Sequence, residues 1–213
     1  MVRIAVLVSG GGTNLQALID AQARGELKNG AIAAVISSKP GAYALERAEK
    51  AGIPGYVVAR REFSSNREMT LALVEQLREL DIGLVVLAGF MHILTEEMVA
   101  AYPNAILNVH PALIPSFCGA GYYGLHVHEA ALAYGVKVTG ATVHFVNEEP
   151  DGGPIVLQKA VEILEGDTPE VLQRRVMEQA EWKILPQAVS LFCEGRLSVE
   201  GRTVHIKQDK ESK

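Results

Sequence analysis

Short aliphatic runs alternate along the first half of the chain with segments whose apolar residues recur every three or four positions. The runs are rich in Val, Ile and Leu, and they predict buried strands at residues 4–8, 31–36, 56–59, 84–88 and 106–109. The periodic segments predict helices at 14–23, 42–51 and 65–80, and Thr95 caps a shorter helix before the last of these strands. This order is typical of an α/β fold with an open, mostly parallel sheet and helices on both faces.

The second half of the chain has longer and more amphipathic strands, expected at 138–146 and 155–163. A glycine-rich, aromatic loop at 116–124 precedes a helix that carries residues 129–134. Thr168 followed by proline is a strong helix start, and we expect that helix to continue to about residue 194 with a kink at Pro186. A hairpin at 197–206 and a frayed polar tail complete the prediction.

Composition and charge narrow the class of protein. The 213 residues are 48% hydrophobic without repeat or linker, which favours one domain, and the net charge of −5 argues against a broad nucleic-acid surface. Cys118 and Cys193 are too few for a disulfide scaffold. The longest apolar stretch, about 84–91, is far shorter than the roughly 20 residues that span a bilayer. We therefore expect a cytoplasmic protein with neither membrane nor nucleic-acid partners.

The segment 9–14, Ser-Gly-Gly-Gly-Thr-Asn, joins the first predicted strand to the first helix. Residues without side chains let backbone N–H groups approach a ligand, and a helix N-terminus favours an anion. The segment matches neither the GxGxxG dinucleotide pattern nor the P-loop. We expect a phosphate here, with Thr13 and Asn14 as additional partners. The alternative is a tight turn that binds nothing.

Asn108 and His110 lie two positions apart at the end of a buried strand, so their side chains share one face. The carboxyl ends of strands are where open α/β sheets bind ligands. An amide beside an imidazole can stabilise an oxyanion and move a proton, as acyl transfer requires. A hydrogen-bonded pair of core residues is the equal alternative from spacing alone.

The acidic segment 148–154 is either a solvated turn or the source of a carboxylate that keeps His110 cationic by raising its pKa. A metal cluster of His110, Cys118, His126 and His128 is disfavoured, because residues two apart on a helix do not share a face.

Five segments carry a resemblance to a known family, at 9–16, 87–94, 107–111, 142–146 and 151–155. In this order and over essentially its whole length, the chain resembles the glycinamide ribonucleotide transformylases, folate-dependent formyltransferases of purine synthesis. The resemblance implies metal-free transfer of a formyl group from 10-formyltetrahydrofolate, a co-substrate, to the amine of glycinamide ribonucleotide. Both partners are small molecules, and a homodimer is allowed.

The resemblance also assigns site residues to this sequence. It implies a catalytic trio of Asn108, His110 and Asp151. It implies that the ribonucleotide is held by Gly12, Thr13, Asn14, Glu178 and Glu181. It implies folate contacts from Arg67, Met91, His92, Ile93, Leu94, Asn108, Asn147, Glu148, Glu149, Pro150 and Asp151. The single formyltransferase domain 1–213 would then comprise a phosphate-binding half at about 1–100, a catalytic and folate-binding half at about 101–195, and a hairpin with its tail at 196–213.

Three departures from the family pattern bear on these assignments. His92 stands where many relatives have arginine, which suggests backbone contacts to the pterin. The loop at 116–124 is longer than in better-known relatives. Around Glu178 the spacing shifts by one residue and Trp182 replaces a common histidine, so Glu181 is the firmer position.

Two alternatives to this function remain. The first is a related formyl-folate hydrolase, or a formyltransferase with another acceptor, and both are expected to carry a further domain. The second is a phosphate-binding module without catalysis.

Overall fold

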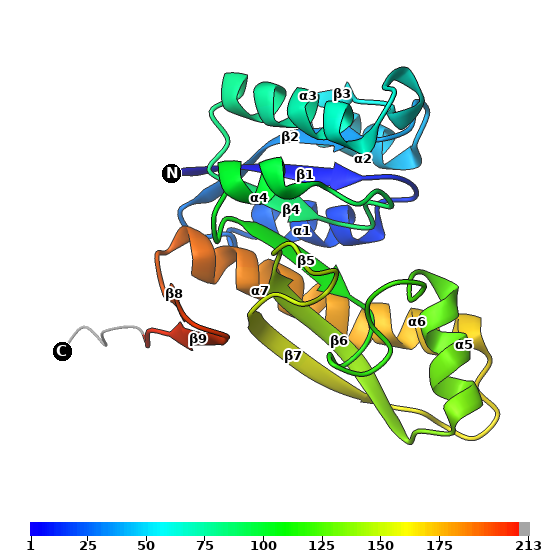
Figure 1. Cartoon of the computed structure of the whole chain (residues 1–213). Coiled ribbons are helices and arrows are strands. Elements are labelled where there is room, and N and C mark those ends of the chain that lie inside the picture. Colours follow the sequence, from blue (N-terminus) through cyan, green and yellow to red (C-terminus); the bar gives the residue numbers. More distant parts are fainter. Residues whose placement is uncertain (209–213) are drawn as a thin grey trace.

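In the computed structural model, which describes residues 1–208, nine strands form one sheet (Figure 1). Their order is β3-β2-β1-β4-β5-β6-β7-β9-β8. The first five strands in this order are parallel, and β6 is antiparallel to both β5 and β7. Strand β9 pairs in parallel with β7 and forms a hairpin with β8. The strands are β1 (Val2–Val8), β2 (Gly30–Ser37), β3 (Gly55–Val57), β4 (Leu84–Leu87), β5 (Ile106–His110), β6 (Val138–Phe145), β7 (Ile155–Glu162), β8 (Leu197–Glu200) and β9 (Thr203–Ile206).

Helices cover both faces of the sheet, which confirms the expected α/β class. Apolar side chains of α1, α2, α6 and α7 pack on one face, and those of α3 and α4 pack on the other. Helix α5 packs beside α6. The helices are α1 (Thr13–Ala23), α2 (Tyr43–Lys50), α3 (Asn66–Glu79), α4 (Glu96–Ala101), α5 (Leu125–Tyr134), α6 (Pro169–Val176) and α7 (Trp182–Cys193), with a 3-10 turn at Arg60–Glu62.

The long helix expected from Thr168 to about residue 194 is interrupted before Pro186, and the expected kink at Pro186 itself stays a prediction. A π-helical turn, Met177–Glu181, separates α6 from α7, and Pro186 lies inside α7. The proline ring must avoid the carbonyl four residues earlier, which is that of Trp182, the first residue of α7. The irregularity therefore precedes the proline by one turn. A π turn holds one residue more than an α-helical turn, so it can accommodate the one-residue shift in spacing that the sequence indicates around Glu178.

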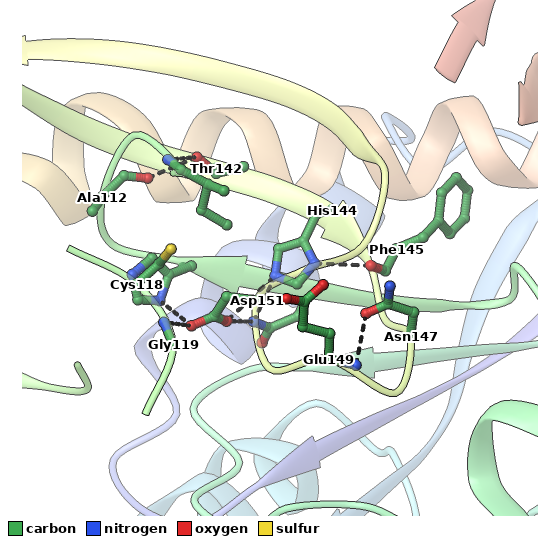
Figure 2. A network of polar contacts seen from close by, with 12 residues as sticks. Ala112, Cys118, Gly119, Thr142, His144, Phe145, Asn147, Glu149 and Asp151 are labelled. Carbon is green, nitrogen blue, oxygen red and sulfur yellow. Dashed lines mark hydrogen bonds and ion pairs between the residues drawn. The ribbon is translucent and has the colours of Figure 1, made fainter. Parts of the chain in front are cut away.

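Strand register places the candidate residues at one edge of the sheet. Leu87 at the end of β4 pairs with Leu7 of β1 on one side and with Asn108 of β5 on the other. The connections that follow β1 and β4 therefore begin level with Asn108. The β6–β7 connection folds back over β5, which brings Asp151 to the same place (Figure 2). The hairpin is confirmed, whereas the polar tail at 209–213 lies outside the described residues.

Candidate active site

The glycine loop turns from β1 into α1 with its backbone close to α2. Gly12 precedes the helix in the left-handed region, at φ 71°, where residues with a side chain are strained. A Cβ at Gly12 would stand 2.7 Å from the Cβ of Ala44, so the position has no space for a side chain. Thr13 is exposed at the first turn of α1, whose first N–H groups have no partner within the helix. The loop therefore has the backbone geometry of an anion site.

Asn14 is bonded to a residue 167 positions away. Its Nδ2 donates to the Glu181 carboxylate over 2.7 Å, and both side chains are buried. Burial raises the pKa of Glu181 to about 7, and the bond from Asn14 opposes that rise. Glu178 is instead exposed, with its carboxylate 3.9 Å from Arg174. The structure brings Glu181 to the glycine loop and leaves Glu178 on the surface.

Asn108, His110 and Asp151 come together, as the spacing and the resemblance predicted. Asn108 Nδ2 lies 3.4 Å from Asp151 Oδ1, and His110 Nδ1 lies 3.5 Å from Asp151 Oδ2. His110 is 4% exposed, so this contact is shielded from water. Asp151 has φ 54° in the connection between β6 and β7, a conformation that Asp tolerates better than most residues.

The expectation that Asp151 keeps His110 cationic is wrong for this structure. Burial is the largest influence on the imidazole and lowers the pKa of His110, although Asp151 and the Phe117 carbonyl oppose that shift. For Asp151 the balance goes the other way. Burial alone would raise the pKa of Asp151, but hydrogen bonds and nearby histidines lower it below its ordinary value. The resting pair is therefore an ionised carboxylate beside a neutral imidazole at pH 7.

His144, which the sequence analysis gave no role, belongs to the same cluster. It lies opposite Asn108 in the β5–β6 register, and its Nε2 is 3.1 Å from Asn108 Nδ2. Its Nδ1 is 2.8 Å from the Phe145 carbonyl oxygen, which can only accept (Figure 2). The proton is therefore on Nδ1, and Nε2 accepts from Asn108. A histidine within an aliphatic run was the available signal for this residue.

The loop at 116–124 contributes backbone groups to the cluster. The Phe117 carbonyl oxygen lies 2.8 Å from His110 Nε2. The N–H of Gly119 donates to Asp151 Oδ2 over 2.9 Å (Figure 2). Cys118 donates to the Pro115 carbonyl, and burial raises the pKa of its thiol. No side-chain pattern could have revealed these contacts, since each of the three has a main-chain atom as one partner.

A cavity of about 150 Å³ adjoins the cluster between the segment after β4 and the β6–β7 connection. Nine of the eleven residues expected to contact folate line it. They are His92, Ile93, Leu94, Asn108, Asn147, Glu148, Glu149, Pro150 and Asp151, together with Leu87, Phe90, His144 and Val146.

The two other expected folate residues lie outside this cavity. The N–H of Met91 donates to Ser9 Oγ over 2.9 Å, and the residue is about half exposed. Arg67 forms an ion pair with Glu97 along a neighbouring depression. That depression shares Ile93, Leu94 and Glu148 with the cavity.

The residues of the disfavoured metal cluster do not form one group of ligands in the part of the chain that the structure describes. His126 is exposed and bonded to Glu129 over 2.8 Å. His128 is fully buried, and its ring nitrogens have no hydrogen-bond partner among residues 1–208. Within that range no three His, Cys, Asp or Glu side chains are grouped as metal ligands. None of the helices described is long and apolar enough to cross a membrane.

An α/β fold with a polar cluster at the carboxyl ends of its parallel strands is typical of an enzyme. Comparison with known proteins identifies the family. Residues 2–189 match the family described as Formyl transferase, and the chain belongs to that family. It is 45% identical to phosphoribosylglycinamide formyltransferase of Haemophilus influenzae, over 97% of this chain and 94% of that protein. The resemblance inferred from the five segments is thereby confirmed.

Solved structures agree with this placement. Glycinamide ribonucleotide transformylase 1 from Symbiobacterium toebii has a TM-score of 0.92 and 47% identity, covering 98% of this chain and 95% of that one. A formyltetrahydrofolate deformylase from Pseudomonas syringae pv. tomato has a TM-score of 0.86 at 27% identity, covering 97% of this chain and 66% of that one. The fold alone is thus shared by transferases and a deformylase.

Proposed function

We propose that this enzyme transfers the formyl group of 10-formyltetrahydrofolate to the amine of glycinamide ribonucleotide. The products are formylglycinamide ribonucleotide and tetrahydrofolate, in the de novo synthesis of purines. One observation carries the proposal. Asn108, His110 and Asp151 converge beside a cavity, at the edge of the sheet where the glycine loop also begins, in a chain that is 45% identical to an enzyme of this name.

The ribonucleotide phosphate occupies the glycine loop in this proposal, held by Gly12, Thr13 and Asn14. Unpaired N–H groups and the positive end of the α1 dipole favour an anion there. Glu181 fixes the Asn14 side chain by accepting its hydrogen bond, and it supplies a further polar group for the ribonucleotide. Glu178 lies on the surface beside Arg174, and we leave it out of the proposed site.

The folate occupies the cavity beside the cluster. Its walls combine apolar side chains at Ile93 and Leu94 with polar groups from residues 147–151, as expected for a heterocycle with several donors and acceptors. The His92 ring contacts the Phe90 ring edge-on. Burial is the main cause that lowers the pKa of His92. Arg67 borders the neighbouring depression, where it can meet the outer part of a bound folate.

The chemistry needs an oxyanion donor and a proton carrier. The amine nitrogen attacks the formyl carbon, a C–N bond forms, and negative charge develops on the formyl oxygen. The Asn108 amide is the donor for that oxygen. His144 orients the amide by accepting one of its protons, and the other turns from Asp151 Oδ1, which lies 3.4 Å from the same nitrogen, to the formyl oxygen. The bond from the formyl carbon to the folate nitrogen then breaks. No covalent bond to the enzyme is needed.

His110 moves the proton in this proposal. Its Nε2–H is held by the Phe117 carbonyl, so Nδ1 carries the free lone pair in the neutral ring. A proton lost by the amine is taken up there, and the imidazolium is stabilised by Asp151 before the proton passes to the folate nitrogen. Burial thus sets His110 as a base at rest, and Asp151 lowers the cost of its protonation.

The acceptor decides between this function and its alternatives. The purified protein is incubated with 10-formyltetrahydrofolate, and release of tetrahydrofolate is followed with and without glycinamide ribonucleotide. Release only with the ribonucleotide is the expected result. Release into water alone would indicate a hydrolase. No release under either condition would leave a binding module.

A further inference from the structure

Helix α2 holds the carbonyl groups of the glycine loop. The N–H of Ala44 donates to the Gly10 carbonyl over 3.1 Å, and Arg47 Nε donates to the Gly11 carbonyl over 2.8 Å. The next carbonyl, that of Gly12, accepts from the N–H of Gln16 within α1. Three consecutive carbonyls at the start of α1 are therefore occupied by groups of the protein itself.

Arg47 is held in place by more than this one bond. Its Nη1 donates to Gln16 Oε1 over 2.9 Å, and its guanidinium lies 4.9 Å from the centre of the Tyr43 ring. Gln16 in turn donates to Asp20 over 2.8 Å. A half-buried arginine with an acceptor, an amide and an aromatic ring around it has little rotational freedom. The Arg47 side chain thus connects α2 to the start of α1 in one fixed conformation.

Holding a carbonyl also fixes the N–H that follows it. In a trans peptide the C=O of one residue and the N–H of the next point in opposite directions. Bonds from α2 to the Gly10 and Gly11 carbonyls therefore turn the N–H groups of Gly11 and Gly12 away from α2. These groups add to the unpaired N–H groups of the first turn of α1.

We propose that Arg47 is a positioning residue for the ribonucleotide phosphate, acting through the Gly11 peptide. It fixes the orientation of the Gly12 N–H and adds a positive charge beside the loop. This inference rests on the proposed function, because it assumes that the loop binds the phosphate of glycinamide ribonucleotide.

The test compares glycinamide ribonucleotide with glycinamide riboside, which lacks the 5′-phosphate, as acceptors for the wild-type enzyme and Arg47→Met. The ratio of their kcat/KM values measures what the phosphate contributes. We expect this ratio to fall roughly tenfold in Arg47→Met, through KM for the ribonucleotide. The kcat at saturation and the KM for 10-formyltetrahydrofolate should stay within about twofold.

Lys50→Met is the matched control. Lys50 lies on the same helix and 5.5 Å from the same Tyr43 ring, and the substitution removes the same charge without touching the loop. It should leave the ratio unchanged. Arg47→Lys keeps the charge but cannot reproduce both bonds, so it should lower the ratio at least threefold and provides the test if Arg47→Met does not fold.

The outcomes separate the two claims. Wild-type turnover with an unchanged ratio in the folded Arg47 variants would overturn this inference alone. An equal fall of the ratio in Lys50→Met would also overturn it, because bulk charge would then be the cause. No wild-type turnover of the ribonucleotide would overturn the proposed function, and this inference with it.

Discussion

Asn14 on α1 donates a 2.7 Å hydrogen bond to the carboxylate of Glu181, which is 5% exposed at the end of a π-helical turn. The contact joins the glycine loop to the π turn between α6 and α7. Burial raises the pKa of Glu181 to about 7, well above its value of 4.5 in an unfolded chain. The folded state therefore prefers the protonated acid, and stability is lost as the pH rises from about 4.5 through 7.

Glu181→Gln should remove this pH dependence, because the amide is always neutral. Between pH 4.5 and pH 8, the burial of Glu181 should lower the unfolding free energy of the wild type by about 2–3 kcal/mol, and Glu181→Gln should not show this loss. Denaturant unfolding at the two pH values measures the difference. Glu178→Gln on the same π turn, where the side chain is exposed, is the control and should change little. Parallel pH curves for Glu181→Gln and wild type would contradict the burial of a carboxylate here.

Gly12→Ala should weaken the ribonucleotide and spare the folate. Its Cβ would stand 2.7 Å from Ala44 Cβ, so the loop must shift and the N–H groups lose their alignment. We expect the KM for glycinamide ribonucleotide to rise roughly tenfold with little change for 10-formyltetrahydrofolate. Gly41→Ala has the same φ of 71° and open space around it, so it reproduces the backbone strain alone and should leave both KM values unaltered. Equal KM values in Gly12→Ala and the wild type would remove the phosphate from this loop.

Asn108→Ala should affect the chemical step more than binding. It removes the amide that would stabilise the charge on the formyl oxygen, a loss that typically lowers kcat by about 10²–10³. Steady-state kinetics of the folded variant with both substrates measures the effect. Near-normal kcat would exclude Asn108 from the mechanism.

Asp151→Asn tests the electrostatic link to His110. The carboxylate raises the pKa of His110 against the larger effect of burial, so its removal should lower that pKa further. The acid limb of the kcat profile should then move to lower pH, while kcat itself falls because the imidazolium loses its partner. NMR titration of the His110 ring in both proteins measures the pKa directly.

Glu149→Gln is the control for that titration. It removes a carboxylate from the same connection, and we expect the pKa of His110 to stay where it is in the wild type. An identical titration of His110 in Asp151→Asn and in the wild type would refute the electrostatic role of Asp151.

Local pattern was sufficient for most of the fold. The elements of the parallel half begin and end within two residues of their predicted bounds, because buried aliphatic runs and periodic helices carry strong signals. The π turn was not predicted, since no residue type specifies it. Asn108 and His110 could be paired from spacing, whereas the pairing with Asp151 came from the resemblance.

The rest of the site depends on tertiary structure. His144 meets Asn108 only through the β5–β6 register, and Phe117 and Gly119 act through main-chain atoms. The charge state of His110 depends on how deeply it is buried, which outweighs the carboxylate beside it. A sequence indicates which side chains can interact, but it does not indicate how deeply the folded protein buries them.

The most direct test of the proposed function follows the formyl carbon itself. The enzyme is incubated with glycinamide ribonucleotide and with 10-formyltetrahydrofolate that carries ¹³C in its formyl group. The amounts of formylglycinamide ribonucleotide and tetrahydrofolate are then measured. We expect one labelled formylglycinamide ribonucleotide for each tetrahydrofolate released, with none of the label in formate. Label recovered as formate, or tetrahydrofolate released without labelled ribonucleotide, would contradict it.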